Sequence, residues 1–564
     1  MAPQPRAHPV WGRPIDDYVA SYDLAAAQKR KAVTRKGEAE AVDAIRSVSR
    51  LARQTRATPS ENVTIQTLET ILQLTLSPRT FHHFAHPPLV SGCIALLSEV
   101  KPEGRPSPFS YEFGYLGFKI LTLAVGACIL QRSNNLDGMT SRMAFELDTG
   151  PLLIFSDSVA QAVNARIQLG MVGGPCDWVL DWVEGMGSQR GAIVPQSDVH
   201  TLLILLWEDR ELFLKAFAGT YTPGPSGILF LLWRHLHFER VFDSQPPSKL
   251  AAPFCEILWR YMLVFTRDQG DTLILLQKHL QACSATDVWD LSPKTVTLSD
   301  LKNLIQLYSD RLPMSHSEIS PSLNIGVIPI LLKFVSHLAG ERPGAEESYP
   351  LLVERTLERV CDTLTLETER DDFEARLGHA QALFSFLALL FEHMENNQTY
   401  NHSQAGQRAV LGVLKALKRL GILDLIIRMF LMLKSTSDAR MDYRVSSAFM
   451  LQVASTIIRK IAAIAPKYII DSTFKYYIPD WIKFHEHLLY LVNGAPTTSD
   501  PLTAHLESCC RVWRELAETL GIYYQIDIAL SNPLSCSYVR CANPTARNGA
   551  QDPLVCGTGR MAGD

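Results

Sequence analysis

The sequence lacks the short motifs that mark the common nucleotide-binding and hydrolytic enzymes. No Gly–Lys dipeptide occurs in its 564 residues, which excludes a P-loop with its phosphate-binding lysine. No Gly-x-Ser-x-Gly sequence is present either, so the nucleophile elbow of an α/β-hydrolase is excluded. Gly185, Gly187 and Gly191 only approximate a dinucleotide-binding fingerprint, because the third glycine comes one residue too late and no strand–turn–helix pattern surrounds them. These absences argue against the best-known enzyme classes.

Cysteine and net positive charge are also scarce. Eleven cysteines in 564 residues are too few for a disulfide-based fold. Most are single residues in apolar runs, which predicts buried, reduced thiols; these are Cys93, Cys128, Cys255, Cys283 and Cys361. The formal net charge is −4, whereas a general nucleic-acid binder should be clearly basic, so no nucleic-acid partner is expected.

The sequence also lacks the apolar pattern of a secretory leader and that of a membrane span. The first residues, MAPQPRAHPVWGRPIDDYV, contain no apolar core between a basic flank and a cleavage site. Residues 113–130 are apolar except for Lys119, but eighteen residues are marginal for a bilayer, and a lysine in mid-span is costly. We therefore predict a buried core helix there, no membrane partner, and an intracellular location in the cytoplasm or nucleus.

Strand-like alternation is nearly absent, and helical periodicity runs through the chain from about Ser60. In the C-terminal half, apolar residues recur three or four positions apart along successive segments, as expected for helices with one buried face. One such face comprises Ala380, Leu383, Phe384, Leu387, Leu390, Phe391 and Met394. On the preceding helix, Glu354, Arg355, Glu358 and Arg359 are expected to face water. The sequence predicts an all-α fold.

One pair of segments suggests how these helices assemble. A stripe precedes Gly421 and the apolar segment 423–433; it comprises Val410, Val413, Leu414, Leu417 and Leu420. Two such helices joined by a glycine hinge cannot bury all their apolar surface alone, but a stack of hairpins can. We therefore predict an irregular armadillo/HEAT-like α-solenoid, with a large helical bundle as the alternative because no strict repeat period is visible.

Candidate catalytic groups are scattered. His82, His83 and His86 form the sequence HHFAH, which has the i, i+4 spacing of zinc ligands but lacks the glutamate of a metalloprotease. Residues 172–198 form a glycine- and proline-rich connection that could carry function. An enzyme with an active site in a helical cleft, built from these histidines or this loop, therefore remains the alternative hypothesis.

The most specific chemical pattern lies near the C-terminus. Cys536 and Cys541 are separated by four residues, and Cys556 follows after fourteen more. The surrounding segment is polar and rich in proline, glycine and asparagine, so it cannot form an apolar core by itself. Zinc bound by thiolates would supply folding energy to such a segment. The alternative is that these are loose thiols in a disordered tail.

The sequence NPLSCSYVRCANP, followed by LVCG, resembles the opening of a MYND-type zinc finger, as found at the C-termini of large helical fungal proteins. The resemblance implies that Cys536, Cys541 and Cys556 are metal ligands. The fourth ligand is expected at position 559, which is Gly559, and the later ligands of the family are missing. It also implies a protein partner, since such fingers bind short proline-containing peptides, and MYND fingers can accompany methyltransferase domains.

These observations predict three regions. Residues 1–59 form a polar, partly helical N-terminal segment, residues 60–530 form the armadillo-like helical body, and residues 531–564 form a truncated MYND-type finger with a partial zinc site. The predicted function is that of a non-enzymatic scaffold whose helical surface binds another protein.

Overall fold

A computed structural model gives the architecture as two compact helical units, each described here by itself. Unit 1 comprises residues 1–293 and 316–321, and unit 2 comprises residues 294–315 and 322–564. The structure describes residues 7–28, 30–53, 63–171, 180–182, 191–239, 249–292, 295–313, 321–324, 326–340, 344–365, 373–396, 403–432, 447–494 and 501–531. Within these residues there is no β-strand, only two isolated bridges, so the predicted all-α class is confirmed.

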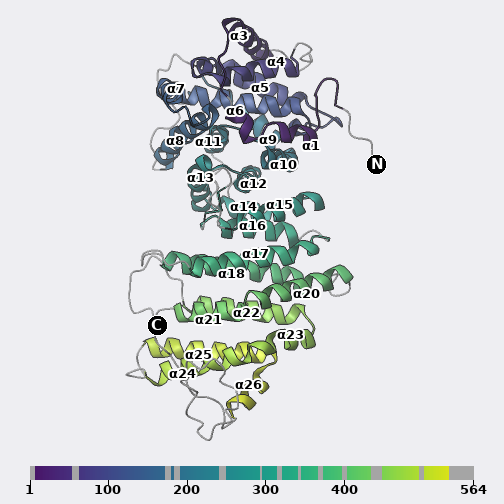
Figure 1. Ribbon diagram of the computed structural model, residues 1–564, viewed down its shortest axis with the longest axis vertical. Helices are drawn as coiled ribbons and strands as arrows, with labels where there is room; N and C mark the ends of the chain where they lie inside the picture. Colours follow the sequence, from purple (N-terminus) through teal and green to yellow (C-terminus); the bar gives the residue numbers. More distant parts are fainter. Residues whose placement is uncertain are drawn as a thin grey trace, which may run out of the picture. The chain divides into compact units, whose positions relative to one another are not determined.

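Unit 1 contains fourteen α-helices among the described residues, and Figure 1 labels all of them except α2. They are α1 (Ile15–Tyr18), α2 (Leu24–Ala27), α3 (Arg35–Arg50), α4 (Ile65–Leu72), α5 (Pro87–Glu99), α6 (Glu112–Arg132), α7 (Leu136–Phe145), α8 (Pro151–Met171), α9 (Gln196–Glu208), α10 (Arg210–Gly219), α11 (Pro225–Phe238), α12 (Ala251–Met262), α13 (Gly270–Ala282) and α14 (Ala285–Leu291).

The centre of unit 1 is helix α6, which contacts α4, α5, α7, α8 and α11. Among the described helices it is the one that is long and apolar enough to cross a membrane, yet every residue of its most apolar window is buried by its neighbours. Gly126 permits the contact with α8, because a Cβ atom there would lie 2.7 Å from the Phe155 ring. The prediction of a buried core helix is confirmed.

The N-terminal segment is fastened to the start of α6 by a charged cluster. Arg13 Nε donates to Glu112 Oε2 at 2.9 Å, and Tyr22 Oη donates to Glu112 Oε1 at 2.6 Å. Burial would raise the pKa of Glu112, but the hydrogen bonds from Arg13 and Tyr22 outweigh it and hold that pKa below its usual value. Burial lowers the pKa of Lys119, two turns further along the same face of α6, to about 8. Residues 7–53 therefore pack into unit 1, although the sequence had set residues 1–59 apart as a polar region.

Unit 2 contains the remaining helices (Figure 1). They are α15 (Leu298–Arg311), α16 (Ile328–Gly340), α17 (Tyr349–Thr365), α18 (Phe373–Asn396), α20 (Gln404–Arg419), α21 (Ile422–Met432), α22 (Ser447–Ile464), α23 (Lys467–Phe474), the 3₁₀ turn η10 (Lys475–Tyr477), α24 (Ile478–Asn493), α25 (Pro501–Leu520) and α26 (Tyr523–Leu530).

These helices stack in two rows. One row runs α16, α18, α22, α25, and the other runs α15, α17, α20, α23, with each helix contacting the next in its row. Cross-contacts such as α17 with α18 and α23 with α25 join the rows. This is the stacking expected of an α-solenoid, in which each hairpin is buried by its neighbours.

The predicted apolar stripes of unit 2 lie inside. Every member of the stripe from Ala380 to Met394 is buried, as are Val410, Val413, Leu414 and Leu417. Leu420, predicted to belong to the second stripe, is only half-buried, because it lies at the C-cap of α20. Gly421 has φ +64°, a conformation that favours glycine, and it ends α20 and permits the turn into α21. Arg359 is a correction: predicted to face water, it is only 6% exposed, because α17 packs against helices on more than one side.

The last helices of unit 2 are held by an aromatic cluster. Trp481 of α24 and Trp513 of α25 stack with ring centroids 3.8 Å apart and planes 16° apart, and the Phe484 ring meets Trp513 edge-on. Trp513 Nε1 also donates to the Trp481 carbonyl at 3.3 Å.

We predict that Trp513→Ala lowers the free energy of unfolding of unit 2 by about 3–5 kcal/mol, because it removes a fully buried aromatic side chain and leaves a cavity. Urea denaturation followed by circular dichroism measures the effect. Tyr490→Ala on α24 is the control, since a side chain that is 65% exposed should change stability by no more than about 0.5 kcal/mol. A loss below about 1 kcal/mol for Trp513→Ala would contradict the role given to this cluster.

Candidate functional site

The predicted zinc ligands Cys536, Cys541 and Cys556 lie outside the described residues, which end at Ser531. The zinc site and the finger from 531 to 564 therefore stay predictions. Among the residues that the structure describes, no group of three or more histidine, cysteine or acidic side chains is arranged to hold a metal ion.

The HHFAH histidines do not converge on a common point. His82 and His83 lie in the 3₁₀ helix η4 (Pro78–Phe84), and His86 is the N-cap residue of α5. His83 Nε2 lies 2.8 Å from Glu38 Oε1 of α3, whereas His82 Nδ1 lies 2.8 Å from the Arg79 carbonyl oxygen. The i, i+4 argument assumed an α-helix, and the prolines at 78, 87 and 88 place a 3₁₀ helix and a helix start there instead.

The loop from 172 to 198 is described only at 180–182 and from 191 onward. In these parts Trp182 is buried, and its Nε1 donates to the Val194 carbonyl at 2.8 Å. Arg132, at the end of α6, donates to the Gly191 carbonyl. The described parts of the loop are thus fixed by packing and by backbone hydrogen bonds.

A histidine pair that the sequence did not single out as a unit lies inside unit 1. His237 Nε2 of α11 is 3.1 Å from His279 Nε2 of α13, and Trp233 Nε1 donates to His279 Nδ1 at 3.3 Å. Burial, with the positive charge of Arg234 nearby, lowers the pKa of both histidines, and His279 lowers that of His237 further. The i, i+2 spacing of His235 and His237 gave no hint of this pair, because its second member comes from another helix.

This pair predicts a loss of stability in acid. The unfolded chain binds protons at these histidines near their ordinary pKa of about 6.5, whereas the folded chain does not, so stability is highest above that pH and falls as pH decreases. Because its pKa in the fold is about 3, His237 stays neutral between pH 7.5 and 5.0 and costs about 2 kcal/mol of stability over that range. His237→Gln should reduce this loss in urea denaturation at the two pH values. His82→Gln, an exposed histidine, should leave it unchanged.

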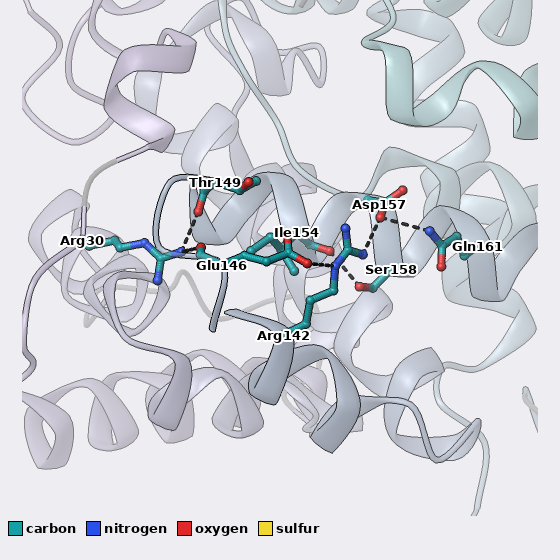
Figure 2. Close-up of polar contacts among 8 residues, drawn as sticks. All are labelled: Arg30, Arg142, Glu146, Thr149, Ile154, Asp157, Ser158 and Gln161. Atoms are coloured by element: carbon teal, nitrogen blue, oxygen red, sulfur yellow. Dashed lines mark hydrogen bonds and ion pairs between the residues drawn. The ribbon is translucent and has the colours of Figure 1, made fainter. Parts of the chain in front are cut away.

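A polar pocket of about 380 Å³ lies where α6, α7 and α8 meet in unit 1. Its polar lining consists mainly of hydroxyl, amide and guanidinium groups, from Ser133, Asn134, Asn135, Arg142, Ser158, Gln161 and Arg166. Figure 2 shows Arg142 reaching between Glu146 and Asp157, with N–O distances of 2.7 and 2.6 Å.

The chemistry of this pocket is limited. Arg142 and Arg166 are the ionisable groups among its lining residues, and arginine keeps its proton in proteins, so neither can act as a general base. Arg30 donates to the backbone carbonyls of Glu146 and Thr149, which fixes the segment after α7 (Figure 2). The arrangement therefore favours a structural role over acid–base chemistry.

The strongest candidate for function is a surface of unit 2. Tyr468 and Tyr476 are each 74% exposed and Tyr524 is 72% exposed, although the tyrosine ring is large and partly apolar. Exposed lysines surround them on α20, α23 and η10. We call this set the tyrosine–lysine surface, and it comprises Lys415, Lys418, Lys467, Tyr468, Lys475, Tyr476 and Tyr524.

Contacts bring some of the elements that carry these residues together. Lys418 Nζ lies 5.8 Å from the centroid of the Tyr476 ring, and Tyr477 donates its hydroxyl proton to the Lys418 carbonyl, so η10 is fixed against α20. At the other end of α23, a Cβ atom at Gly521 would lie 3.4 Å from Lys467 Cε, which brings α23 beside the start of α26.

Buried residues on the same helices hold the tyrosines outward. Ile470 and Phe474 of α23 are buried, as are Ile522 and Ile526 at α26, so their exposed neighbours must face away from the core. Gln525 Nε2 donates to Asp471 Oδ1 at 3.1 Å and fixes α26 against α23. Packing thus fixes the helices that carry these tyrosines.

Sequence analysis missed this surface, although a signal was present. Two Lys–Tyr pairs, at 467–468 and 475–476, flank the apolar residues of α23, and Tyr523 and Tyr524 follow the glycine after α25. Tryptophans in helical segments, such as Trp233 and Trp481, are buried, whereas these tyrosines are exposed.

Comparison with known proteins adds little to this description. No family model matches the chain, and no curated protein matches it. A solved structure described as a "Circular tandem repeat protein with novel repeat topology and enhanced subunit contact surfaces" aligns over 88% of this chain and 100% of its own length. Its sequence identity is 12% and its TM-score 0.22, values at which the alignment supports no inference.

Proposed function

We propose that this protein is a non-enzymatic scaffold that binds a protein partner through the tyrosine–lysine surface of unit 2. The observation that carries the proposal is the exposure of Tyr468, Tyr476 and Tyr524 on helices that are otherwise well packed. Tyrosine is enriched in protein interfaces because it contributes a large contact area and a hydroxyl group at a low cost in conformational entropy. The stacked helices of unit 2 supply a rigid support, which lowers the entropic cost of binding.

A protein partner fits this surface better than a nucleic acid or a membrane. Asp471 and Asp527 stand among the tyrosines on α23 and α26, and they would repel a phosphate backbone or an anionic lipid headgroup. The tyrosines project singly from short helices rather than forming a continuous apolar face that could enter a bilayer.

The terminal cysteines Cys536, Cys541 and Cys556 are proposed as an accessory, partial zinc site. Their resemblance to a MYND-type finger supports binding of proline-containing peptides as a second contact with partners. Three thiolates leave one position of a tetrahedral site open, so zinc would be held by three protein ligands.

The tyrosine variant tests the scaffold proposal. We expect one variant to reduce recovery of specific partners from an extract by about tenfold or more, as when interface hot spots are removed. This variant combines Tyr468→Ser, Tyr476→Ser and Tyr524→Ser. Because all three side chains are largely exposed, the urea midpoint should stay unchanged. Quantitative mass spectrometry after affinity capture measures partner recovery.

Phe145→Ser is the matched control, since Phe145 is 85% exposed on unit 1 and outside the proposed surface. A photo-crosslinking amino acid at position 476 should form a discrete adduct with the partner, and the same group at position 145 should not. Equal capture by the wild-type and triple-variant proteins would reject the proposal.

Zinc content tests the accessory site. We predict at most one zinc ion per purified chain, measured by inductively coupled plasma mass spectrometry, and its loss in Cys536→Ser combined with Cys541→Ser. Cys361→Ser, in helix α17, is the control and should retain the metal. A content near two would contradict a partial site, and a content near zero would show that these cysteines bind no zinc.

A further inference from the structure

We propose that Arg359 of helix α17 is the receptor for a small free oxyanion, a carboxylate or phosphate ion, bound between α15 and α17 of unit 2. The inference is independent of the tyrosine–lysine surface. Its basis is a buried guanidinium group to which the described residues of the fold supply no partner.

Arg359 is only 6% exposed, and its Nε and Nη1 atoms are buried without a hydrogen-bond partner. No carboxylate among the residues that the structure describes forms an ion pair with this side chain. Moving a charge from water into a protein interior is costly unless a partner compensates it, and arginine does not avoid the cost by losing its proton. A buried guanidinium of this kind therefore points to an anionic ligand.

The other buried arginines and lysines of the described residues are in a different situation. Arg132, Arg260 and Arg311 all have interaction partners, as Arg260 has in Glu256, 3.1 Å away. Lys119 has a pKa that burial lowers to about 8, so this lysine can become neutral. Only a ligand or water is left to compensate the charge on the Arg359 side chain.

Burial also separates Arg359 from other arginines of unit 2 that form no ion pair with a described residue. These are Arg408, Arg459, Arg511 and Arg514, and all four are exposed. Water compensates an exposed guanidinium, so these residues need no ligand.

The packing of α17 places Arg359 toward α15. Thr356 lies three positions earlier on the same side of α17, and its Oγ1 is 3.4 Å from Tyr308 Oη of α15. Arg359 and Tyr308 also interact electrostatically. Tyr308 is fully buried, and burial raises its pKa more than Thr356 and Arg359 lower it, so its hydroxyl keeps its proton. A second hydrogen-bond donor is thus near the guanidinium.

The carboxylates of α17 do not cancel this charge. Glu354 and Glu358 both pair with Arg419 on the outer side of the helix. Burial lowers the pKa of Arg359, and Asp362, one turn further along α17, opposes this effect without outweighing it. The surroundings therefore still disfavour the guanidinium charge, and an anion next to it would remove that penalty.

The small exposed fraction of Arg359 limits the size of the ligand. A segment of another protein would have to displace the surrounding helices, whereas a phosphate or acetate ion needs only the planar N–H donors of one guanidinium. The bound ion would become part of the contact between α15 and α17. The stability of unit 2 would then depend on its concentration.

Urea denaturation of the full chain in phosphate, acetate or chloride at equal ionic strength tests this inference. Phosphate also stabilises folded proteins generally, because it is excluded from their surfaces. The informative quantity is therefore the difference between the wild-type and Arg359→Met proteins. We expect phosphate or acetate to raise the wild-type urea midpoint by about 0.5–1 M in a saturable manner, and Arg359→Met to lose this increase.

Arg355→Met is the matched control on the same helix. The Arg355 side chain is 42% exposed and already pairs with Glu358 at 2.8 Å, so this variant should keep the full response. In chloride alone, Arg359→Met should be at least as stable as the wild type, because it removes an uncompensated buried charge and keeps a similar volume. The ³¹P NMR line of inorganic phosphate measures binding directly, and the wild type should broaden it far more than Arg359→Met does.

The outcomes are distinct. Equal responses of the wild-type and Arg359→Met proteins to every anion would overturn the inference and show that water is sufficient for this side chain. A lower midpoint for Arg359→Met in chloride would also overturn it, because the guanidinium would then have stabilising partners within the fold. A response to phosphate alone would assign the site to a phosphate ion, and a response to acetate alone would assign it to a carboxylate. None of these results bears on partner binding by the tyrosine–lysine surface.

Discussion

Each helix of unit 2 has an apolar stripe that must be covered by its neighbours, and this constraint determines the rest of the arrangement. Helix α18 illustrates it, because its stripe from Ala380 to Met394 is fully buried while α18 contacts α16, α17 and α22. No pair of these helices could bury both stripes alone, so the stack gains stability from every added hairpin. The Trp481–Trp513 stack applies the same principle where α24 and α25 meet. Rigid packing below the surface is what fixes the exposed side chains above it.

Unit 1 is arranged differently, because its helix α6 is apolar on all sides and is covered by other helices on all sides. Its few charged groups must then be compensated within the fold. Glu112 is paired with Arg13 and Tyr22, and Lys119 lies with its Nζ 5.6 Å from the Tyr22 ring centroid. The N-terminal segment supplies two of these partners, so a region that reads as polar and peripheral in sequence satisfies the core helix. Arg13 and Tyr22 serve this role, while Asp16, Asp17 and Asp23 of the same segment are exposed to solvent.

Local periodicity and backbone conformation made four features predictable. These are the helical class, the buried stripes, the core helix at 113–130 and the turn at Gly421. The burial of Arg359 was not predictable, since one helix's pattern does not tell how many neighbours it has. The His237–His279 pair was likewise hidden, as its members are 42 residues apart and meet only through the packing of α11 and α13. The tyrosine–lysine surface was missed for a related reason. An aromatic residue in a helical run is usually part of the core, and only the burial of Ile470 and Phe474 shows that Tyr468 and Tyr476 must face outward.

A stacked helical protein does not need exposed tyrosines for its own stability. The outer helices of a solenoid usually carry polar residues on their free faces, because an exposed apolar face promotes association. Helix α26 instead exposes Tyr523, Tyr524 and Ile528, and α23 exposes Tyr468. Substituting them with polar residues would cost the fold little, since their rings contribute little to the core. Folding alone therefore does not explain their presence.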